Sequence, residues 1–112
     1  MGLDTDGYPL EESLENLKSW DYFNRSLADF LKLWNDTWWS PSWGWRFTRR
    51  RLYVSTGGWS GNEETIDYIY RNFLFWSLHW VSTRRGGHYT FELPAKVIKE
   101  ARSLGCVEQG VE

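Results

Sequence analysis

The spacing of apolar residues predicts a helix near the start of the chain. Leu10, Leu14 and Leu17 recur at helical spacing, and Pro9 stands before them at a position that suits the first turn of a helix. The residues ahead of this pattern show no periodicity. We therefore expect a disordered leader over residues 1–8, followed by a first helix.

A second apolar stripe predicts another helix over residues 21–36. The stripe consists of Phe23, Leu27, Phe30, Leu31 and Trp34. The segment WWSPSWGW follows it, and there Pro41 and Gly44 interrupt regular structure. The N-terminal third is thus predicted to contain two helices.

From Trp45 the apolar period changes to two, which predicts a strand. Leu52, Val54 and Thr56 share one face of it. The other face carries Arg49, Arg51, Tyr53 and Ser55. A glycine-rich turn ends this strand, and a helix is predicted over residues 62–72.

Two further strands are predicted over residues 73–83 and 88–93, joined by the turn sequence RRGG, in which glycines supply the positive φ of a hairpin. A last helix begins after Pro94 and ends at Gly105. The predicted fold class is α+β. It is a small three-stranded mixed sheet (β-α-β-β) with helices packed on one face, two extra N-terminal helices and one C-terminal helix.

The predicted β-α-β unit brings two similar loops together. If its strands pair, they are parallel, so that both end at the same edge of the sheet. STGGWSGNE follows the first strand and STRRGGHY the second. We expect the two loops to lie side by side at the edge where open α/β sheets bind ligands.

The hairpin register sorts the remaining side chains. Closing the turn pairs Thr83 with His88 and His79 with Glu92, which predicts His79 as a structural residue bonded to Glu92. The core face is then Leu74, Trp76, Leu78, Trp80, Tyr89, Phe91 and Leu93. The polar face is Ser77, His79, Thr83, His88, Thr90 and Glu92. Such a face is either solvated or ligand-binding, and the sequence leaves both open.

Length and composition limit the domain number and the classes of function that the chain can have. The 112 residues suggest a single domain, and 19% of them are aromatic, including nine Trp. The formal net charge of −2 does not favour specific nucleic-acid binding. One cysteine, Cys106, favours a reducing, intracellular setting. We find no signal peptide, and the apolar run FLFWSLHWV is too short to span a bilayer.

The chemistry of the two loops favours a phosphorylated, nucleotide-like ligand over other candidates. Arginines fork onto phosphate oxygens and Trp59 offers a stacking surface for a base. The segment is neither a P-loop nor Gly-x-Gly-x-x-Gly. The predicted ligand-binding residues are Ser55, Thr56, Gly57, Gly58, Trp59, Ser60, Asn62, Glu63, Arg84, Arg85, His88 and Tyr89.

Other chemistries are less favoured. His79 and His88 share the polar face of the predicted hairpin but are four strand steps apart, too far for one metal ion, and we expect no metal and no cofactor. A hydrolase remains a minor alternative, with His88 near Thr83 or Ser55 as a base. No catalytic residue is assigned, and the protein is expected to be non-enzymatic.

Two motifs together, STGGWSGNEE and FWSLHWVSTRRGGHYTFEL, resemble a family of small proteins from tailed-phage genomes. The match covers about residues 52–93. The family pattern marks Ser55, Thr56, Gly57, Gly58, Trp59, Ser60, Asn62, Glu63, Arg84, Arg85, Gly86, Gly87, His88 and Tyr89. The resemblance implies phage origin and residence in the host cytoplasm, and it implies no reaction.

Two functional hypotheses follow. The first is a counter-defence sponge that binds and sequesters a cyclic-nucleotide or ADP-ribose-type immune signal. The second is a protein–protein interaction inhibitor of a host or defence protein, which would use an aromatic surface such as WWSPSWGW. Exposed sheet edges also make a homo-oligomer conceivable.

Overall fold

The computed structural model describes residues 2–110, which form six helices and one four-stranded sheet. The helices are α1 (Glu11–Lys18), α2 (Leu27–Thr37), α3 (Pro41–Gly44), α4 (Ser60–Tyr70), α5 (Phe73–His79) and α6 (Ala95–Ser103). The strands are β1 (Trp45–Phe47), β2 (Arg51–Ser55), β3 (Trp80–Arg84) and β4 (His88–Glu92). The predicted α+β class is confirmed.

The sheet differs from the predicted three-stranded mixed sheet. Its order is β1-β2-β4-β3, and every neighbouring pair is antiparallel. β2 pairs with β4, so the expected parallel β-α-β unit does not form. An extra strand, β1, folds back on β2 and places Trp45 opposite Val54 and Phe47 opposite Leu52.

The predicted strand over residues 73–83 is wrong in its first part. Residues Phe73–His79 form α5, and only Trp80–Arg84 are extended. Asn72 explains the helix start, because its side chain accepts a hydrogen bond from the Phe75 backbone N–H, at 3.3 Å. As a helix, the segment buries Phe75 and His79 four residues apart and exposes Leu74 and Leu78, which were predicted to be core.

The second helix also starts later than predicted, at Leu27 rather than residue 21. Ser26 caps it, because its hydroxyl accepts a hydrogen bond from the Asp29 backbone N–H at 3.2 Å. Phe23, which the stripe had placed on the apolar face, is 76% exposed in the preceding turn. The Ser26 cap therefore determines where α2 begins, although the spacing of apolar residues predicted an earlier start.

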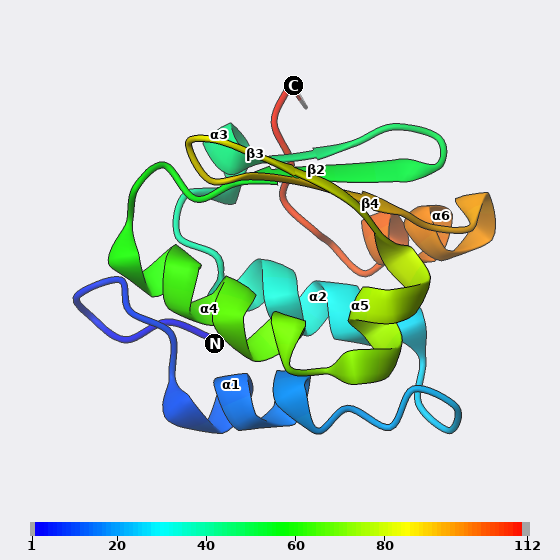
Figure 1. The fold of residues 1–112 in the computed structure, drawn as a ribbon, viewed down its shortest axis with the longest axis horizontal. Helices are drawn as coiled ribbons and strands as arrows, with labels where there is room; N and C mark the ends of the chain where they lie inside the picture. Colours follow the sequence, from blue (N-terminus) through cyan, green and yellow to red (C-terminus); the bar gives the residue numbers. More distant parts are fainter. Residues whose placement is uncertain (1, 111–112) are drawn as a thin grey trace.

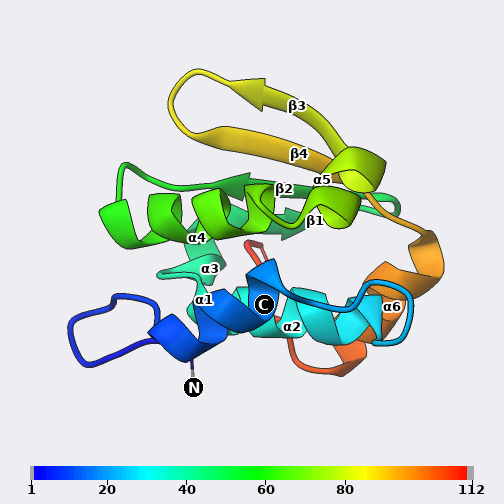
Figure 2. The same cartoon turned by 60° about the horizontal axis from the view of Figure 1, so that its bottom comes forward.

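The helices lie mainly on one side of the sheet, although their layout differs from the predicted one because α3 and α5 were not predicted. Figure 1 shows α2 and α4 beneath the sheet and α1 beneath both of them. Figure 2 shows the β3–β4 hairpin above α4, at the side of the sheet away from β1. The other face of the sheet carries no helical layer in these views.

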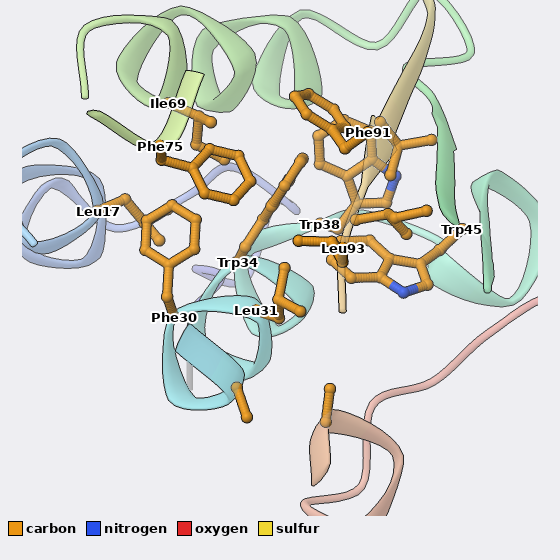
Figure 3. Packing of buried hydrophobic residues seen from close by; sticks show 14 of the residues in the cluster. Leu17, Phe30, Leu31, Trp34, Trp38, Trp45, Ile69, Phe75, Phe91 and Leu93 are labelled. Atoms are coloured by element: carbon orange, nitrogen blue, oxygen red, sulfur yellow. The ribbon is translucent and has the colours of Figure 1, made fainter. Parts of the chain in front are cut away.

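Trp34 on α2 is the centre of the core (Figure 3). Its fully buried ring meets five other aromatic rings edge-on, with centroid distances from 5.2 to 6.3 Å, and these belong to Phe30, Trp38, Trp45, Phe75 and Phe91. Edge-to-face contact is the preferred geometry for aromatic pairs. A few large rings thus join α2, α5 and the sheet.

The hairpin is shifted by one residue from the predicted register. Arg84 is opposite His88 and Thr83 is opposite Tyr89, with an irregularity between Trp80 and Ser82. Arg84 therefore takes the place on the polar face that was assigned to Thr83. The rows of that face are Arg46-Tyr53-Thr90-Ser82, Ser55-His88-Arg84 and Arg51-Glu92.

Both ends of the described chain contact the rest of the fold. Met1 of the predicted leader lies outside the described residues. After it, the Gly2 carbonyl accepts a hydrogen bond from Leu10 N–H, at 2.8 Å, and Leu3 and Pro9 form an isolated bridge. At the other end, Gln109 N–H donates to the carbonyl of Trp45 on β1, at 2.6 Å. The C-terminal segment therefore reaches the edge of the sheet.

Candidate functional site

The two similar loops lie side by side, as expected, although the pairing that brings them together is different. β2 ends where β4 begins, because antiparallel pairing places Ser55 opposite His88. The Thr56 backbone N–H then donates to the carbonyl of Gly87, at 3.0 Å. The start of the STGGW segment thus joins the end of the RRGG turn directly.

The buried polar groups of the STGGWSGNE segment bond within the chain. The Asn62 side chain accepts from Trp39 N–H at 2.8 Å and donates to the carbonyls of Trp39 and Thr56, at 3.1 and 3.3 Å. The Thr56 hydroxyl accepts from Gly58 N–H at 3.3 Å and donates to Glu63 Oε2 at 3.4 Å. Thr56 and Asn62 are both 2% exposed, so these bonds hold the loop to α4 and to the end of α2.

The ring of Trp59, predicted to stack on a base, contacts the chain itself. It packs against Tyr8 and Trp39, with ring centroids 4.8 and 5.3 Å apart. Its indole N–H donates to the carbonyl of Gly7 at 3.0 Å. In this structure Trp59 connects the N-terminal segment to the start of α4.

A hollow of about 180 Å³ opens on the polar face of the sheet. We call it the polar hollow, and its lining residues are Gly44, Arg46, Tyr53, Val54, Ser55, Arg84, His88, Tyr89, Thr90 and Gln109. Figure 1 shows the C-terminal segment passing to this side of the sheet. The site therefore combines residues from β1, β2, β3, β4 and the chain end.

Two arginines give the polar hollow its charge. The guanidinium carbon of Arg46 lies 4.3 Å from the centre of the Tyr53 ring, a cation–π contact that holds this side chain over the sheet. Arg84 is the last residue of β3 and is exposed. Among the lining residues that the structure describes there is no carboxylate, so the site carries net positive charge on a protein of net charge −2.

Ser55 and His88 form the closest polar contact in the hollow. Ser55 Oγ lies 2.7 Å from His88 Nδ1, and both side chains are half-buried. Their positions opposite each other on β2 and β4 create the contact. The other ring nitrogen, His88 Nε2, takes no part in this contact and lies beside Gly86. A Cβ added at Gly86 would lie 3.3 Å from it.

The other predicted ligand residues do not gather in the hollow. Ser60 and Glu63 are exposed on the first turn of α4, and Arg85 is exposed at the tip of the β3–β4 turn. Tyr89 belongs to the core-side row with Val54 and Thr83, although it also borders the hollow. Of the twelve predicted residues, Ser55, Arg84, His88 and Tyr89 line the polar hollow, together with four polar residues outside that set: Arg46, Tyr53, Thr90 and Gln109.

A sequence signal for Arg46 exists. The apolar residues Trp45 and Phe47 have odd numbers, whereas Leu52 and Val54 have even numbers, with TRRR between them. Such a change of phase indicates a turn between two strands rather than one long strand. Gln109 has no comparable signal, because its place depends on the packing of the C-terminal segment.

His79 has a structural role, as predicted, with a different partner atom on Glu92. Its Nδ1 lies 2.9 Å from the Glu92 backbone carbonyl, and its Nε2 lies 2.6 Å from the hydroxyl of Tyr22. Burial lowers the pKa of His79 below its ordinary value, and the Glu92 bond opposes this shift. The ring is therefore neutral at pH 7 and links α5 to β4 and to the turn before α2.

Cys106 is not activated as a nucleophile. Burial raises the pKa of its thiol to about 12, so the reactive thiolate is absent at neutral pH. Within residues 2–110, no group of three or more His, Cys, Asp or Glu side chains is placed to hold a metal ion. None of the helices in that range combines the length and the apolar character needed to cross a bilayer.

Comparison with known proteins found no matching family model, no matching curated protein and no matching solved structure.

Proposed function

We propose that the polar hollow binds the phosphate group of a small nucleotide-like ligand and that the protein holds this ligand without converting it. The observation that carries the proposal is the placement of Arg46 and Arg84 around one hollow whose described lining has no carboxylate. Guanidinium groups bind phosphate oxygens in a forked geometry. Ser55, His88 and Thr90 add hydrogen-bonding groups between the two cations.

The size of the hollow limits what lies inside it. Its volume of about 180 Å³ is below the range of roughly 300–1,000 Å³ that is usual for sites enclosing a drug-sized ligand. A phosphate with part of its ribose would therefore occupy the hollow, and a base would extend over the open sheet face. This suits a sponge for a cyclic-nucleotide or ADP-ribose-type signal in the host cytoplasm, the biological role that we propose.

Adjacent arginines on the hairpin allow a matched test. Arg84 lines the polar hollow, whereas Arg85 is exposed at the turn and lies outside the lining. We expect calorimetry with inorganic phosphate, ADP-ribose and a cyclic dinucleotide to detect binding of at least one of them. Arg84→Ala should weaken this binding about tenfold, the effect of losing one charge-assisted contact, and Arg85→Ala should change it less than about twofold.

Two results would overturn the proposal. One is the absence of heat with every ligand of the panel. The other is an equal loss in Arg84→Ala and Arg85→Ala, which would indicate general attraction to a basic turn rather than a site.

The contact of Ser55 with His88 favours a hydrolase as the second candidate. A serine hydroxyl beside an imidazole nitrogen is the minimal arrangement for an activated nucleophile. Steady turnover of a bound phosphate ester or acyl ester, abolished by Ser55→Ala, would show this activity. Stoichiometric binding with no product would leave the sponge as the function.

The segment WWSPSWGW gives less support to the alternative hypothesis, in which the protein inhibits a host or defence protein through an aromatic surface. Trp38 and Trp45 are core residues, 1% and 0% exposed. Trp39 packs on Trp59, and Trp43 lies against Gly57, which leaves Trp43 at 58% exposure as the most accessible ring of the segment.

A further inference from the structure

A second cavity lies on the other side of the β3–β4 hairpin, between the sheet and α4. It has a volume of about 400 Å³, and we call it the aromatic groove; its lining residues are Glu63, Ile66, Asp67, Tyr70, Trp76, Thr83 and Tyr89. Figure 2 shows the arrangement that forms it, with the hairpin above α4. The polar hollow and the aromatic groove therefore occupy opposite faces of the same two strands.

Three aromatic rings form the walls of the groove. The Tyr70 and Trp76 rings are 5.1 Å apart and nearly perpendicular, at 83°, and the Trp76 and Tyr89 rings are 6.2 Å apart at 72°. Tyr70 is 60% exposed, which is unusual for a ring beside a core. The electron-rich faces of such rings attract cations.

The acidic side of the groove comes from α4. Glu63, Asp67 and Tyr70 share one stripe of this helix at positions i, i+4 and i+7, with buried Ile66 between them as part of the floor. Both carboxylates are exposed, and the lining that the structure describes contains no Lys, Arg or His. Arg71 pairs with Asp67 and the Thr56 hydroxyl donates to Glu63, so that Glu63 is the carboxylate of the described lining that has no cationic partner. An anion in the groove would be repelled.

We propose that the aromatic groove binds an arginine side chain of a partner polypeptide. A guanidinium is planar, stacks on aromatic faces and forks onto carboxylates, so that it fits both the rings of the groove and the carboxylate of Glu63. The chain shows this chemistry at the same helix. Arg71 pairs with Asp67 while its guanidinium carbon lies 4.8 Å from the centre of the Tyr68 ring.

The surroundings of the groove indicate a polypeptide rather than free arginine. Trp76 stacks on Trp80 at 6.2 Å and 14°, and Trp80 is 42% exposed, so that the groove continues onto an exposed apolar side chain. Exposed apolar surface bordered by polar groups is typical of protein interfaces. Residues flanking the arginine would cover it.

The first experiment tests the charge requirement. We would titrate the protein with N-acetyl-arginine methylamide and follow backbone and indole NMR signals, with the citrulline derivative as a neutral control of nearly the same shape. We expect saturable shifts at Trp76 and Tyr89 and at least tenfold weaker binding of the citrulline probe. Equal binding of both probes, shifts that map elsewhere or no saturable shift at tens of millimolar would overturn the proposal.

Two neighbouring glutamates supply the control variants. Glu63→Gln removes a carboxylate of the groove, whereas Glu64→Gln removes an exposed carboxylate in the same helical turn that does not line it. We expect Glu63→Gln to weaken binding of the arginine probe several-fold and Glu64→Gln to leave it unchanged. Equal weakening of arginine binding by the two variants would show a general electrostatic attraction and would overturn the proposed site.

The last experiment tests whether the occupant is a polypeptide. Acetyl-Leu-Arg-Leu-amide should bind at least threefold more tightly than the single arginine probe, because a leucine beside the arginine covers the exposed Trp80 ring. Trp80→Ser, at a side chain 42% exposed, should remove this gain, whereas Leu78→Ser, on the side of α5 opposite Trp76, should retain it. No gain from the flanking leucines would overturn the polypeptide as occupant. Binding in the groove and binding in the polar hollow respond to different variants, so that either can fail alone.

Discussion

The STGGWSGNE segment and the β3–β4 turn lie side by side, yet their side chains are used differently. In the first, Thr56 and Asn62 are buried and bond to the chain itself. In the second, Arg84 and Arg85 are exposed. Similar composition therefore supplies a structural connection in one loop and accessible charge in the other, and burial distinguishes the two.

Replacement of Asn62 by alanine should give the largest loss of stability. Three hydrogen bonds to the backbone of Trp39 and Thr56 would disappear in a buried setting, which predicts a loss of about 3 kcal/mol in the free energy of unfolding. The neighbouring exposed Ser60→Ala should change it by less than about 0.5 kcal/mol. Urea unfolding measures both, and equal losses would remove the distinction between buried and exposed positions in this segment.

Two glycines test how closely the loops approach each other. Gly87 and Gly58 have similar positive φ values, 79° and 74°. An added Cβ would lie 2.2 Å from Thr56 Oγ1 at Gly87, whereas at Gly58 it would point into open space. Both alanine variants bear the backbone cost, and only Gly87→Ala adds the clash. We expect Gly87→Ala to be about 2 kcal/mol less stable than Gly58→Ala in urea unfolding.

An equal effect of the two glycine variants would contradict the close contact between the loops. The cost of placing an alanine at positive φ should be nearly the same in both variants, because the two φ values are nearly the same.

The sequence predicted the proximity of the loops through an incorrect strand pairing. A parallel β2–β3 pair and the observed antiparallel β2–β4 pair both place the end of β2 beside the residue-86 turn. The polar face was predicted correctly for Tyr53, Ser55, His88 and Thr90, because alternation along a strand does not depend on its neighbour. Thr83 was wrong, since the turn contains three residues, 85–87, instead of the predicted four, which places Arg84 opposite His88; the irregularity between Trp80 and Ser82 then returns Trp80 to its predicted position opposite Phe91.

The apolar run FLFWSLHWV shows why the rest could not be predicted. A short continuous apolar run fits a buried strand and a helix equally well by periodicity. The capping side chain of Asn72 and the packing of Phe75 against Trp34 decide for a helix over most of the run. The second of these is a tertiary contact that local sequence does not contain.

The buried side chain of His79 extends the comparison of buried and exposed groups to pH. Because the folded pKa of His79 is below its ordinary value of 6.5, the unfolded chain takes up a proton near that pH that the folded chain does not. Stability from this group is complete above pH 6.5 and declines as the pH falls below it. We expect the free energy of unfolding to be lower at pH 5.5 than at pH 7.5.

A variant of His79 identifies the source of this dependence. His79→Asn should reduce the difference between the two pH values, because it removes the titrating group while an amide can still donate toward the Glu92 carbonyl. An undiminished difference in His79→Asn would show that the dependence arises from another group.

The neighbouring hydroxyl groups of Ser55 and Thr56 allow the comparison with the smallest expected change in stability. Thr56→Val removes a buried acceptor for Gly58 N–H and should cost about 1 kcal/mol, whereas Ser55→Ala removes a half-buried hydroxyl and should cost about 0.5 kcal/mol. Phosphate binding should show the opposite order, because only Ser55 lines the polar hollow. Calorimetry and urea unfolding on the same two variants therefore separate binding from stability. If Thr56→Val weakened phosphate binding more than Ser55→Ala did, the binding site would lie in the STGGW segment and not on the sheet face.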